Sequence, residues 1–166
     1  MKNIPYSRQH ISSKDVLSVT KSMKEDMITT GASTKKFENK ISKYCKSKYA
    51  TLVSSATAGL HLSCLALGVG KKDYVWCSAN SFVASSNAAL YCGANIDFVD
   101  IDLDDYNLST SKLEVKLQNT PKKKHPKVLI VTHLGGLSVD LKKVSQISKK
   151  YNFKIIEDAS HALGST

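Results

Sequence analysis

Residues 128–131 read Val-Leu-Ile-Val, a run without a single polar side chain. A strand with one solvated face alternates apolar and polar residues, so an unbroken apolar run predicts a strand that is buried on both faces. Strands of this kind occur in parallel sheets that carry helices on either side. The run therefore predicts a parallel α/β sheet in which residues 128–131 form an inner strand.

Helices and strands alternate on both sides of this run. Beyond it, residues 139–151 have the apolar spacing of a helix with a lysine-rich outer face, and residues 153–157 predict another strand. Before it, the same patterns predict strands at 49–53, 74–77 and 96–101. They also predict a helix that follows Ser12, contains Val16, Val19, Met23 and Met27 and is broken at residues 30–31, a helix that contains Phe37, Ile41 and Tyr44, and helices at 58–67, 81–91 and 109–118. Alternation of this kind predicts a three-layer α/β/α fold with a mostly parallel sheet.

The composition of the chain is that of an ordinary globular protein. Of its 166 residues, 42% are hydrophobic and 23% are charged, which excludes a disordered or collagen-like chain. No apolar run approaches the roughly 18 residues of a membrane-spanning helix, so we expect no membrane partner. The N-terminal segment is too polar for a signal peptide, and we therefore expect a cytoplasmic protein.

The formal net charge of +10 raises the question of nucleic-acid binding. Only one of the 24 basic residues is an arginine, Arg8, although arginine is the residue that most often reads bases and phosphates. The densest basic cluster, at 121–126, lies between two prolines and is interpreted as a solvated loop. We therefore expect no nucleic-acid partner, and the charge is available to attract an anionic substrate.

The cysteines do not form a metal-binding or redox motif. They stand at Cys45, Cys64, Cys77 and Cys92 without a C-x-x-C pair, which argues against a zinc ribbon and a thioredoxin motif. We expect all of them to be buried, reduced thiols.

Ligands of parallel sheets bind beyond the carboxyl ends of the strands. In this chain those ends carry residues 54–57, 78–82, 100–102, 133–136 and 158–161. Ser54 to Thr57 place hydroxyl groups where a helix begins, and free N–H groups together with hydroxyl donors make an anion site there. The alternative is a plain helix N-cap without a ligand.

Three further side chains at this edge suit a flat, charged ligand. Asp158 follows a buried strand and is suited to neutralise a ring-nitrogen cation, and His161 lies close behind it. Phe82 begins a helix at the same edge, where an aromatic ring is able to stack on a cofactor. The alternative interpretation makes Asp158 a capping residue and His161 a polar histidine with ordinary hydrogen-bond partners. For Phe82 the alternative is packing in the core. His133 lacks a ligand-like spacing to the other groups, so we expect no metal site.

Taken together and in order, these segments resemble the DegT/DnrJ/EryC1/StrS sugar aminotransferases. The resemblance extends from Tyr6 to the end of the chain and rests on Tyr6, 28–31, 37–38, 55–60, 81–84, 93–94, 98–100 and 157–164. Members of this family are pyridoxal-phosphate (PLP) enzymes with the aspartate aminotransferase fold, also called fold type I. The resemblance implies PLP as the cofactor and an incomplete large domain of that fold.

The resemblance also implies roles for individual residues. Ala56 and Thr57 would hold the cofactor phosphate, Phe82 would stack on the pyridine ring, Asp158 would pair with the protonated ring nitrogen, and His161 would lie beside the ring. The residues implied at the sugar-nucleotide site are Tyr6, Asp26, Met27, Ile28, Thr29 and Ser55.

The implied reaction is the transfer of an amino group, with glutamate as donor, to a sugar nucleotide. The implied acceptor is C4 of a UDP-linked 4-keto-6-deoxy-N-acetyl hexose, in the biosynthesis of pseudaminic acid or a related amino sugar. Since family members use both subunits in their active sites, a homodimer is implied for the full-length enzyme.

One element of the family pattern is not found in this chain. The lysine that forms a Schiff base with the cofactor is expected on the C-terminal side of the Asp158 motif, past Thr166, and no helix closes the last strand. We therefore expect a part of a longer enzyme, inactive alone, with an N-terminal helical segment at 1–32 and the first part of the cofactor-binding large domain at 33–166. The alternative function is that of a non-catalytic pseudo-enzyme that binds a sugar nucleotide.

Overall fold

The computed structural model describes residues 5 and 8–165 of the chain. These residues belong to two compact units, Met1–Leu52 and Val53–Thr166, which we describe separately. The predicted boundary after residue 32 concerns the domains of a complete enzyme and stays a prediction.

The first unit contains two helices, α1 (Ser13–Ser22) and α2 (Ala32–Tyr44). Helix α1 begins with a capping box, in which the Ser12 hydroxyl accepts from the Asp15 N–H and the Asp15 carboxylate accepts from the Ser12 N–H at 2.7 Å. Neither helix buries a residue within this unit. The apolar periodicity predicts both helices, and both are confirmed. Helix α1 is shorter than predicted, because residues 23–31 form turns and bends instead of continuing the helix through Met27.

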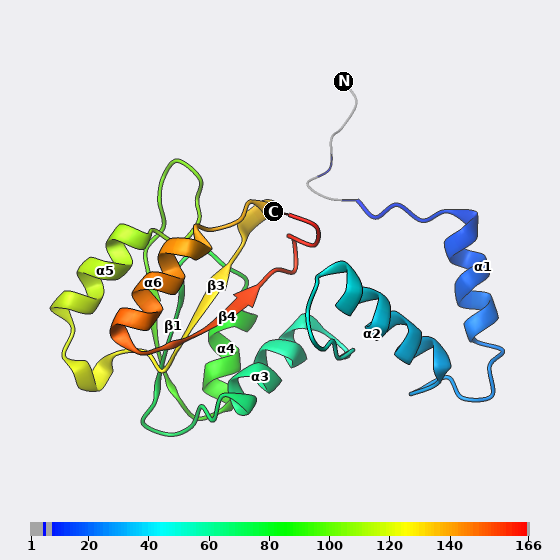
Figure 1. Ribbon diagram of the computed structural model, residues 1–166, viewed down its shortest axis with the longest axis horizontal. Coiled ribbons are helices and arrows are strands. Elements are labelled where there is room, and N and C mark those ends of the chain that lie inside the picture. Colours follow the sequence, from blue (N-terminus) through cyan, green and yellow to red (C-terminus); the bar gives the residue numbers. More distant parts are fainter. Residues whose placement is uncertain (1–4, 6–7, 166) are drawn as a thin grey trace. The chain divides into compact units, whose positions relative to one another are not determined.

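The second unit is built on a parallel sheet (Figure 1). Among the described residues the sheet has four strands in the order β2-β1-β3-β4, and each neighbouring pair is parallel. The strands are β1 (Tyr74–Ser78), β2 (Asn95–Val99), β3 (Val128–Thr132) and β4 (Lys154–Asp158). The helices are α3 (Ala56–Ala66), α4 (Ala84–Tyr91), α5 (Thr110–Asn119) and α6 (Leu141–Tyr151), with short 3-10 turns at Lys122–Lys124 and Leu134–Gly136.

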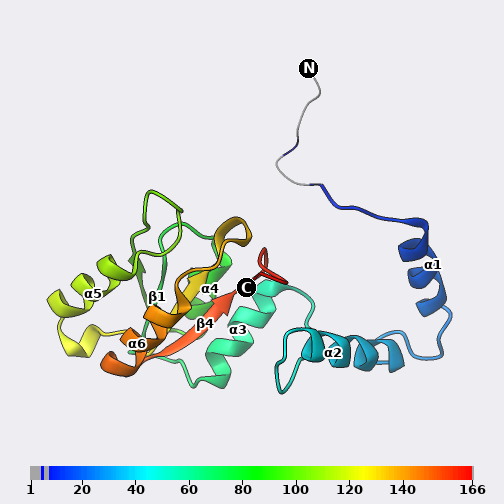
Figure 2. The same ribbon diagram turned by 45° about the horizontal axis from the view of Figure 1, so that its top comes forward.

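Helices cover both faces of the sheet, as Figure 2 shows. Helices α3 and α4 pack on one face around Val75, Cys77 and Ile130. Helices α5 and α6 pack on the other face around Trp76 and Leu129. Each residue of 128–131 is fully buried, because successive side chains of a strand point to opposite faces and both faces are covered. The three-layer α/β/α fold and the inner position of this strand are therefore confirmed.

The strand predicted at 49–53 is wrong. The segment has no regular structure, and among the described residues no other strand pairs with it. A strand requires a neighbour that accepts and donates its backbone hydrogen bonds. Here the Leu52 N–H donates instead to the Glu38 carboxylate at 2.9 Å.

The remaining elements agree with the sequence to within a few residues. In the second unit the largest difference is at α4, which begins at Ala84 rather than Ser81 because residues 79–83 form the loop that leaves β1. In the described ranges, every helix is too short or too polar to span a bilayer.

The cysteines are all free thiols, as predicted, but their burial differs from the prediction. Cys64 and Cys77 are buried and Cys92 is partly buried, whereas Cys45 is exposed at the end of α2. Burial raises the pKa of the Cys64 thiol to about 11 and that of Cys77 to about 12. Cys45 lies in the first unit, where the described residues include no sheet that would bury a thiol of α2.

Removing the buried Leu113 side chain should destabilise the second unit strongly. Leu113 on α5 is fully buried, so Leu113→Ala leaves a cavity and should lower the free energy of unfolding by about 2–5 kcal/mol. Val115 lies on the same helix with 54% of its surface exposed. Val115→Ala should therefore change the free energy of unfolding by less than about 0.5 kcal/mol. Urea unfolding measures both values. Equal effects of the two substitutions would contradict the described packing of α5.

The thiols should react at very different rates with a chromogenic disulfide reagent. The thiolate is the reactive form, so the buried, high-pKa Cys64 and Cys77 should react only as the protein unfolds, while exposed Cys45 reacts at once. Cys45→Ser should abolish the fast phase and leave the slow phases unchanged. Partly buried Cys92, whose pKa burial also raises, should react more slowly than Cys45. A fast phase of unchanged size in Cys45→Ser would show that Cys45 is not the exposed thiol.

Candidate functional site

The carboxyl ends of β1, β3 and β4 meet at one edge of the sheet. These strands end at Ser78, Thr132 and Asp158, and Thr132 is the register partner of Asp158. Because all strands are parallel, the loops that leave them gather on this side. The edge predicted from the sequence to hold a ligand is therefore the edge at which these polar side chains lie.

A chain of hydroxyl groups connects the three loops. The Ser81 hydroxyl lies 2.7 Å from that of Thr132 and 2.8 Å from that of Ser85. The Ser85 hydroxyl donates to Asp158 Oδ2 at 3.2 Å, although 73 positions of sequence separate the two residues. These bonds tie the start of α4 to the ends of β3 and β4.

Asp158 is buried, and both of its carboxylate oxygens are engaged. Oδ1 accepts from the Ser160 hydroxyl at 2.6 Å and from the Ser160 N–H at 3.3 Å, while Oδ2 accepts from Ser85. Burial of a carboxylate is costly unless it is hydrogen-bonded, and these donors supply the bonds. The carboxylate is thus held in one orientation at the end of β4.

Helix α3 presents its N-terminus to the same edge. At its other end, Lys127 Nζ donates to the Gly68 carbonyl at 2.6 Å, and the Lys127 N–H donates to the Tyr74 carbonyl at the beginning of β1. The C-terminus of α3 therefore lies at the amino edge of the sheet. A helix of 11 residues and a strand of five both span roughly 16 Å, so the first turn of α3 reaches the carboxyl edge.

The first turn of α3 has N–H groups available for an anion. Ser55 caps the helix, since its hydroxyl accepts from the Ala58 N–H at 3.1 Å and its carbonyl from the Gly59 N–H at 3.0 Å. The N–H groups of Ala56 and Thr57 have no carbonyl of the helix before them. They lie at the positive end of the helix dipole, which favours a phosphate group.

Phe82 lies in the loop between β1 and α4 and is 72% exposed. Together with Ser78, Ser81 and Phe98 it borders a cavity of about 240 Å³ at the carboxyl edge. The alternative that Phe82 packs in the core is wrong, because its ring is in contact with solvent. An exposed ring in this position is available to stack on a planar ligand.

The two histidines of this region, His133 and His161, are in different surroundings. His161 is exposed in the turn after β4. His133 is buried, its Nδ1 accepts from the Val139 N–H at 3.2 Å, and its Nε2 lies 3.3 Å from Glu157 Oε2. With both ring nitrogens bonded, His133 is a structural residue. Within the described part of the chain, no group of three or more His, Cys, Asp or Glu side chains is arranged to hold a metal ion.

The residues predicted at a sugar-nucleotide site belong to different parts of the chain. Residues 26–29 form an exposed loop between α1 and α2 in the first unit. Ser55 is the N-cap of α3 in the second unit. Tyr6 lies outside the described residues. Their role in substrate binding stays a prediction.

A second cavity in this unit lies at the amino edge and has a volume of about 600 Å³. It is lined mainly by basic and aromatic side chains, namely Lys72, Lys122, Lys123, Lys127, Lys150, His125, Tyr74 and Tyr151. Helix α6 ends here, and a lysine near a helix C-terminus, such as Lys150, stabilises its partial negative charge. This larger cavity of the unit lies at the amino edge of the sheet, away from Asp158.

Ser81, Ser85 and Thr132 were not singled out by the sequence as site residues. Serine and threonine are common in loops and at strand ends, so their types alone do not distinguish them. The available signal was their position, since each follows or ends a strand whose carboxyl end was expected to carry the ligand.

Known proteins resemble this chain over almost its full length. UDP-4-amino-4,6-dideoxy-N-acetyl-beta-L-altrosamine transaminase of Campylobacter jejuni is 39% identical over 162 residues, which cover 98% of this chain and 42% of that protein. UDP-4-amino-4-deoxy-L-arabinose–oxoglutarate aminotransferase of Shewanella sediminis is 35% identical over 161 residues, or 97% of this chain and 40% of that protein. The chain thus spans about two fifths of the length of these curated relatives.

Solved aminotransferase structures have the same fold. The PLP form of Spr1654 from Streptococcus pneumoniae matches with a TM-score of 0.87 and 31% identity, over 98% of this chain and 44% of that chain. The aminotransferase from Psychrobacter cryohalolentis matches with a TM-score of 0.88 and 25% identity, over 98% and 40%.

The match to a family model covers residues 9–166, which include the sheet, the first turn of α3 and the Asp158 segment. With this agreement of sequence and fold, the chain belongs to the DegT/DnrJ/EryC1/StrS aminotransferase family.

Proposed function

We propose that this chain forms part of the cofactor-binding domain of a PLP-dependent sugar-nucleotide aminotransferase. The observation that carries the proposal is the placement of a buried, oriented carboxylate, Asp158, and a capped helix N-terminus, at Ala56 and Thr57, on one edge of the sheet. PLP has a phosphate at one end and a basic ring nitrogen at the other. The two protein groups have the charges that suit those ends.

The hydrogen-bonding and aromatic groups at this edge match the chemical groups of the cofactor. The N–H groups of Ala56 and Thr57 and the Thr57 hydroxyl are hydrogen-bond donors for a phosphate at a helix N-terminus. The Asp158 carboxylate is an acceptor for a protonated ring nitrogen. The exposed ring of Phe82 offers a flat apolar surface for the pyridine ring, and His161 is proposed to lie beside it.

When bound, PLP supplies the electron sink that amino-group transfer requires. The role of Asp158 is to keep the ring nitrogen protonated, because an adjacent anion favours the charged form of a base. The donors Ser85 and Ser160 hold Asp158 in the orientation for this contact. Ser55 orders the first turn of α3, so that its N–H groups are arranged before the phosphate arrives.

The loops at this edge do not supply an amine for catalysis. Residues 54–57, 79–86, 132–139 and 158–165 contain no lysine. A lysine that would bond to the cofactor and move protons must come from another part of the enzyme. We therefore propose that this chain binds the cofactor but does not catalyse turnover by itself.

We propose a UDP-linked 4-keto-6-deoxy-N-acetyl hexose as the amino acceptor and glutamate as the donor. The support is the name of the Campylobacter jejuni relative, which acts on a UDP-linked amino sugar, and that of the Shewanella sediminis relative, which uses oxoglutarate. The net charge of +10 favours the approach of an anionic nucleotide. A homodimer is proposed for the full-length enzyme.

The second candidate function is that of a pseudo-enzyme, favoured by the absence of lysine from these edge loops. Binding of a UDP-sugar without binding of the cofactor would support it. The two functions therefore differ in their response to the cofactor.

Pyridoxamine 5′-phosphate is the ligand that tests the cofactor site. It carries an amine in place of the aldehyde, so it does not react with surface lysines. Asp158→Asn removes the partner of the ring nitrogen and should weaken its binding by about tenfold or more, which corresponds to roughly 1.4 kcal/mol. Isothermal titration calorimetry on the chain measures the dissociation constant.

The matched control for this experiment is Asp104→Asn. Asp104 is exposed in the loop after β2, and the affinity of that variant should equal that of the unchanged chain. Equal binding by Asp158→Asn would remove Asp158 from the proposed role. No binding to the unchanged chain would contradict the proposed cofactor site.

Removal of the Thr57 hydroxyl should weaken the phosphate end of the site. Thr57→Val keeps the shape of the side chain and deletes one donor, so the affinity for pyridoxamine 5′-phosphate should fall about 5- to 30-fold, the equivalent of about 1–2 kcal/mol. Affinity for pyridoxamine without phosphate should change little. Thr110→Val, in the first turn of α5, is the control and should leave both affinities unchanged. An equal loss for both ligands would argue against a phosphate contact.

A further inference from the structure

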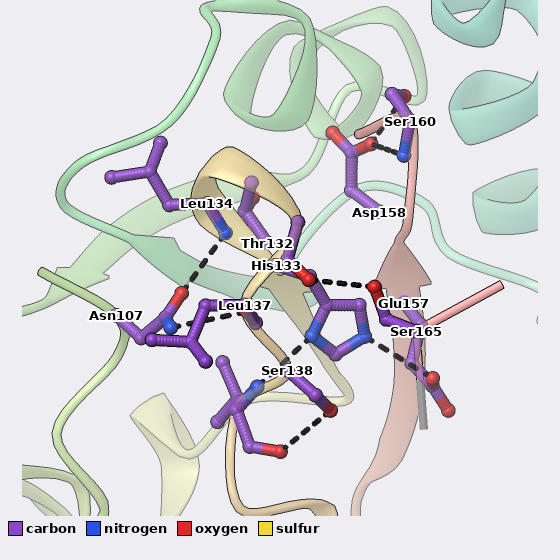
Figure 3. A network of polar contacts seen from close by, with 12 residues as sticks. Asn107, Thr132, His133, Leu134, Leu137, Ser138, Glu157, Asp158, Ser160 and Ser165 are labelled. Atoms are coloured by element: carbon purple, nitrogen blue, oxygen red, sulfur yellow. Dashed lines mark hydrogen bonds and ion pairs between the residues drawn. The ribbon is translucent and has the colours of Figure 1, made fainter. Parts of the chain in front are cut away.

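Asn107 is a buried polar residue that the proposed chemistry does not use. It lies in the loop between β2 and α5 and is 1% exposed. Its side-chain amide donates to the Leu137 carbonyl at 3.2 Å, and its Oδ1 accepts from the Leu134 N–H at 3.0 Å (Figure 3). One side chain thus binds both ends of the turn at residues 134–137, which follows β3.

Asn107 is itself held firmly. Its N–H donates to Asp105 Oδ1 at 2.9 Å, and its carbonyl accepts from the Asp102 N–H at 2.8 Å. The next residue, Leu108, forms an antiparallel bridge with Ile101 and is buried. The loop after β2 therefore holds the Asn107 amide at a defined place.

The turn at 134–137 depends on contacts from outside. Gly135 and Gly136 have φ values of 61° and 91°, a left-handed conformation that interrupts regular backbone pairing. The hydrogen bonds of the turn itself, from the Gly136 N–H to the His133 carbonyl and from the Leu137 N–H to the Leu134 carbonyl, leave the Leu134 N–H and the Leu137 carbonyl for partners outside it. Asn107 provides them at Leu134 and Leu137, because its amide group has both a donor and an acceptor.

The same turn is packed against the segment that carries Asp158 and His161. A Cβ atom at Gly136 would lie 2.9 Å from the His161 carbonyl oxygen, so the two backbones are in close contact. The Ser165 hydroxyl donates to the Gly136 carbonyl at 2.7 Å, and the His133 N–H donates to the Asp158 carbonyl at 3.1 Å. A shift of the turn would therefore move the backbone of this segment.

We propose that Asn107 is a positioning residue for the cofactor edge. It holds the turn at 134–137, and this turn, together with the pairing of β3 with β4 at Thr132 and Asp158, sets the backbone position of the segment from Asp158 to His161. The inference rests on the proposed function, since the position of these two residues matters to a ligand only if they contact it. Asn107 itself does not contact the cofactor.

Hydrogen exchange followed by NMR tests the contact without a ligand. In Asn107→Ala the Leu134 amide loses its acceptor, and its exchange should become on the order of tenfold faster relative to the amides of β3. The control is Leu117→Ala, which removes a buried side chain of α5 and should accelerate exchange throughout the unit without singling out Leu134. Unchanged relative exchange of Leu134 in Asn107→Ala would overturn the proposal.

Binding of pyridoxamine 5′-phosphate then tests the consequence for the site. At a temperature where every variant is folded, Asn107→Ala should bind about tenfold more weakly than the unchanged chain, while Leu117→Ala should bind equally well. Equal binding by Asn107→Ala would overturn the positioning role. Failure of the unchanged chain to bind would contradict the proposed function instead, and the exchange result would still decide whether Asn107 holds the turn.

A third variant separates positioning from general stability. Asn107→Asp keeps an acceptor for the Leu134 N–H, but while ionised it has no donor for the Leu137 carbonyl. Acid protonates the new carboxyl group and restores a donor. The affinity relative to the unchanged chain at the same pH should therefore recover as the pH falls. A ratio that is constant or declines with falling pH would contradict the hydrogen bond to Leu137 as the cause.

Discussion

The parallel pairing of four strands around the buried β3 is the constraint on which the rest of the described structure depends. Residues 128–131 have no polar side chain, so both faces of β3 require a helical cover, and helices that cross from one strand to the next keep the strands parallel. Parallel strands have all their carboxyl ends on one side. For this reason Ser78, Thr132 and Asp158 lie at the same edge of the sheet.

This edge of the sheet carries groups of opposite charge. The Asp158 carboxylate carries a negative charge and accepts three hydrogen bonds. The first turn of α3 has N–H groups with a partial positive charge. A ligand with an anionic end and a cationic end is the chemical class that such an edge suits. The chain belongs to an aminotransferase family, which agrees with this chemistry. This family membership is the reason why PLP is the proposed ligand.

The sequence predicted most of the fold because its strongest signals are local. The apolar periodicity of residues 139–151 and the hydroxyl caps at Ser12 and Ser55 depend on neighbours within a few positions, and all of them appear in the structure. The strand predicted at 49–53 failed for the opposite reason. A strand is stable only with a partner, and no local pattern shows whether the partner is present.

The sequence by itself determined the alternation of elements, the inner position of β3 and the location of Asp158 at the end of a strand. Tertiary structure alone decided which side chains meet there. Ser85 reaches Asp158 across 73 positions, and Asn107 reaches Leu137 across 30. The physical reason is that a hydrogen bond requires two groups within about 3 Å, and the packing of helices on the sheet, which depends on the whole chain, brings them to that distance.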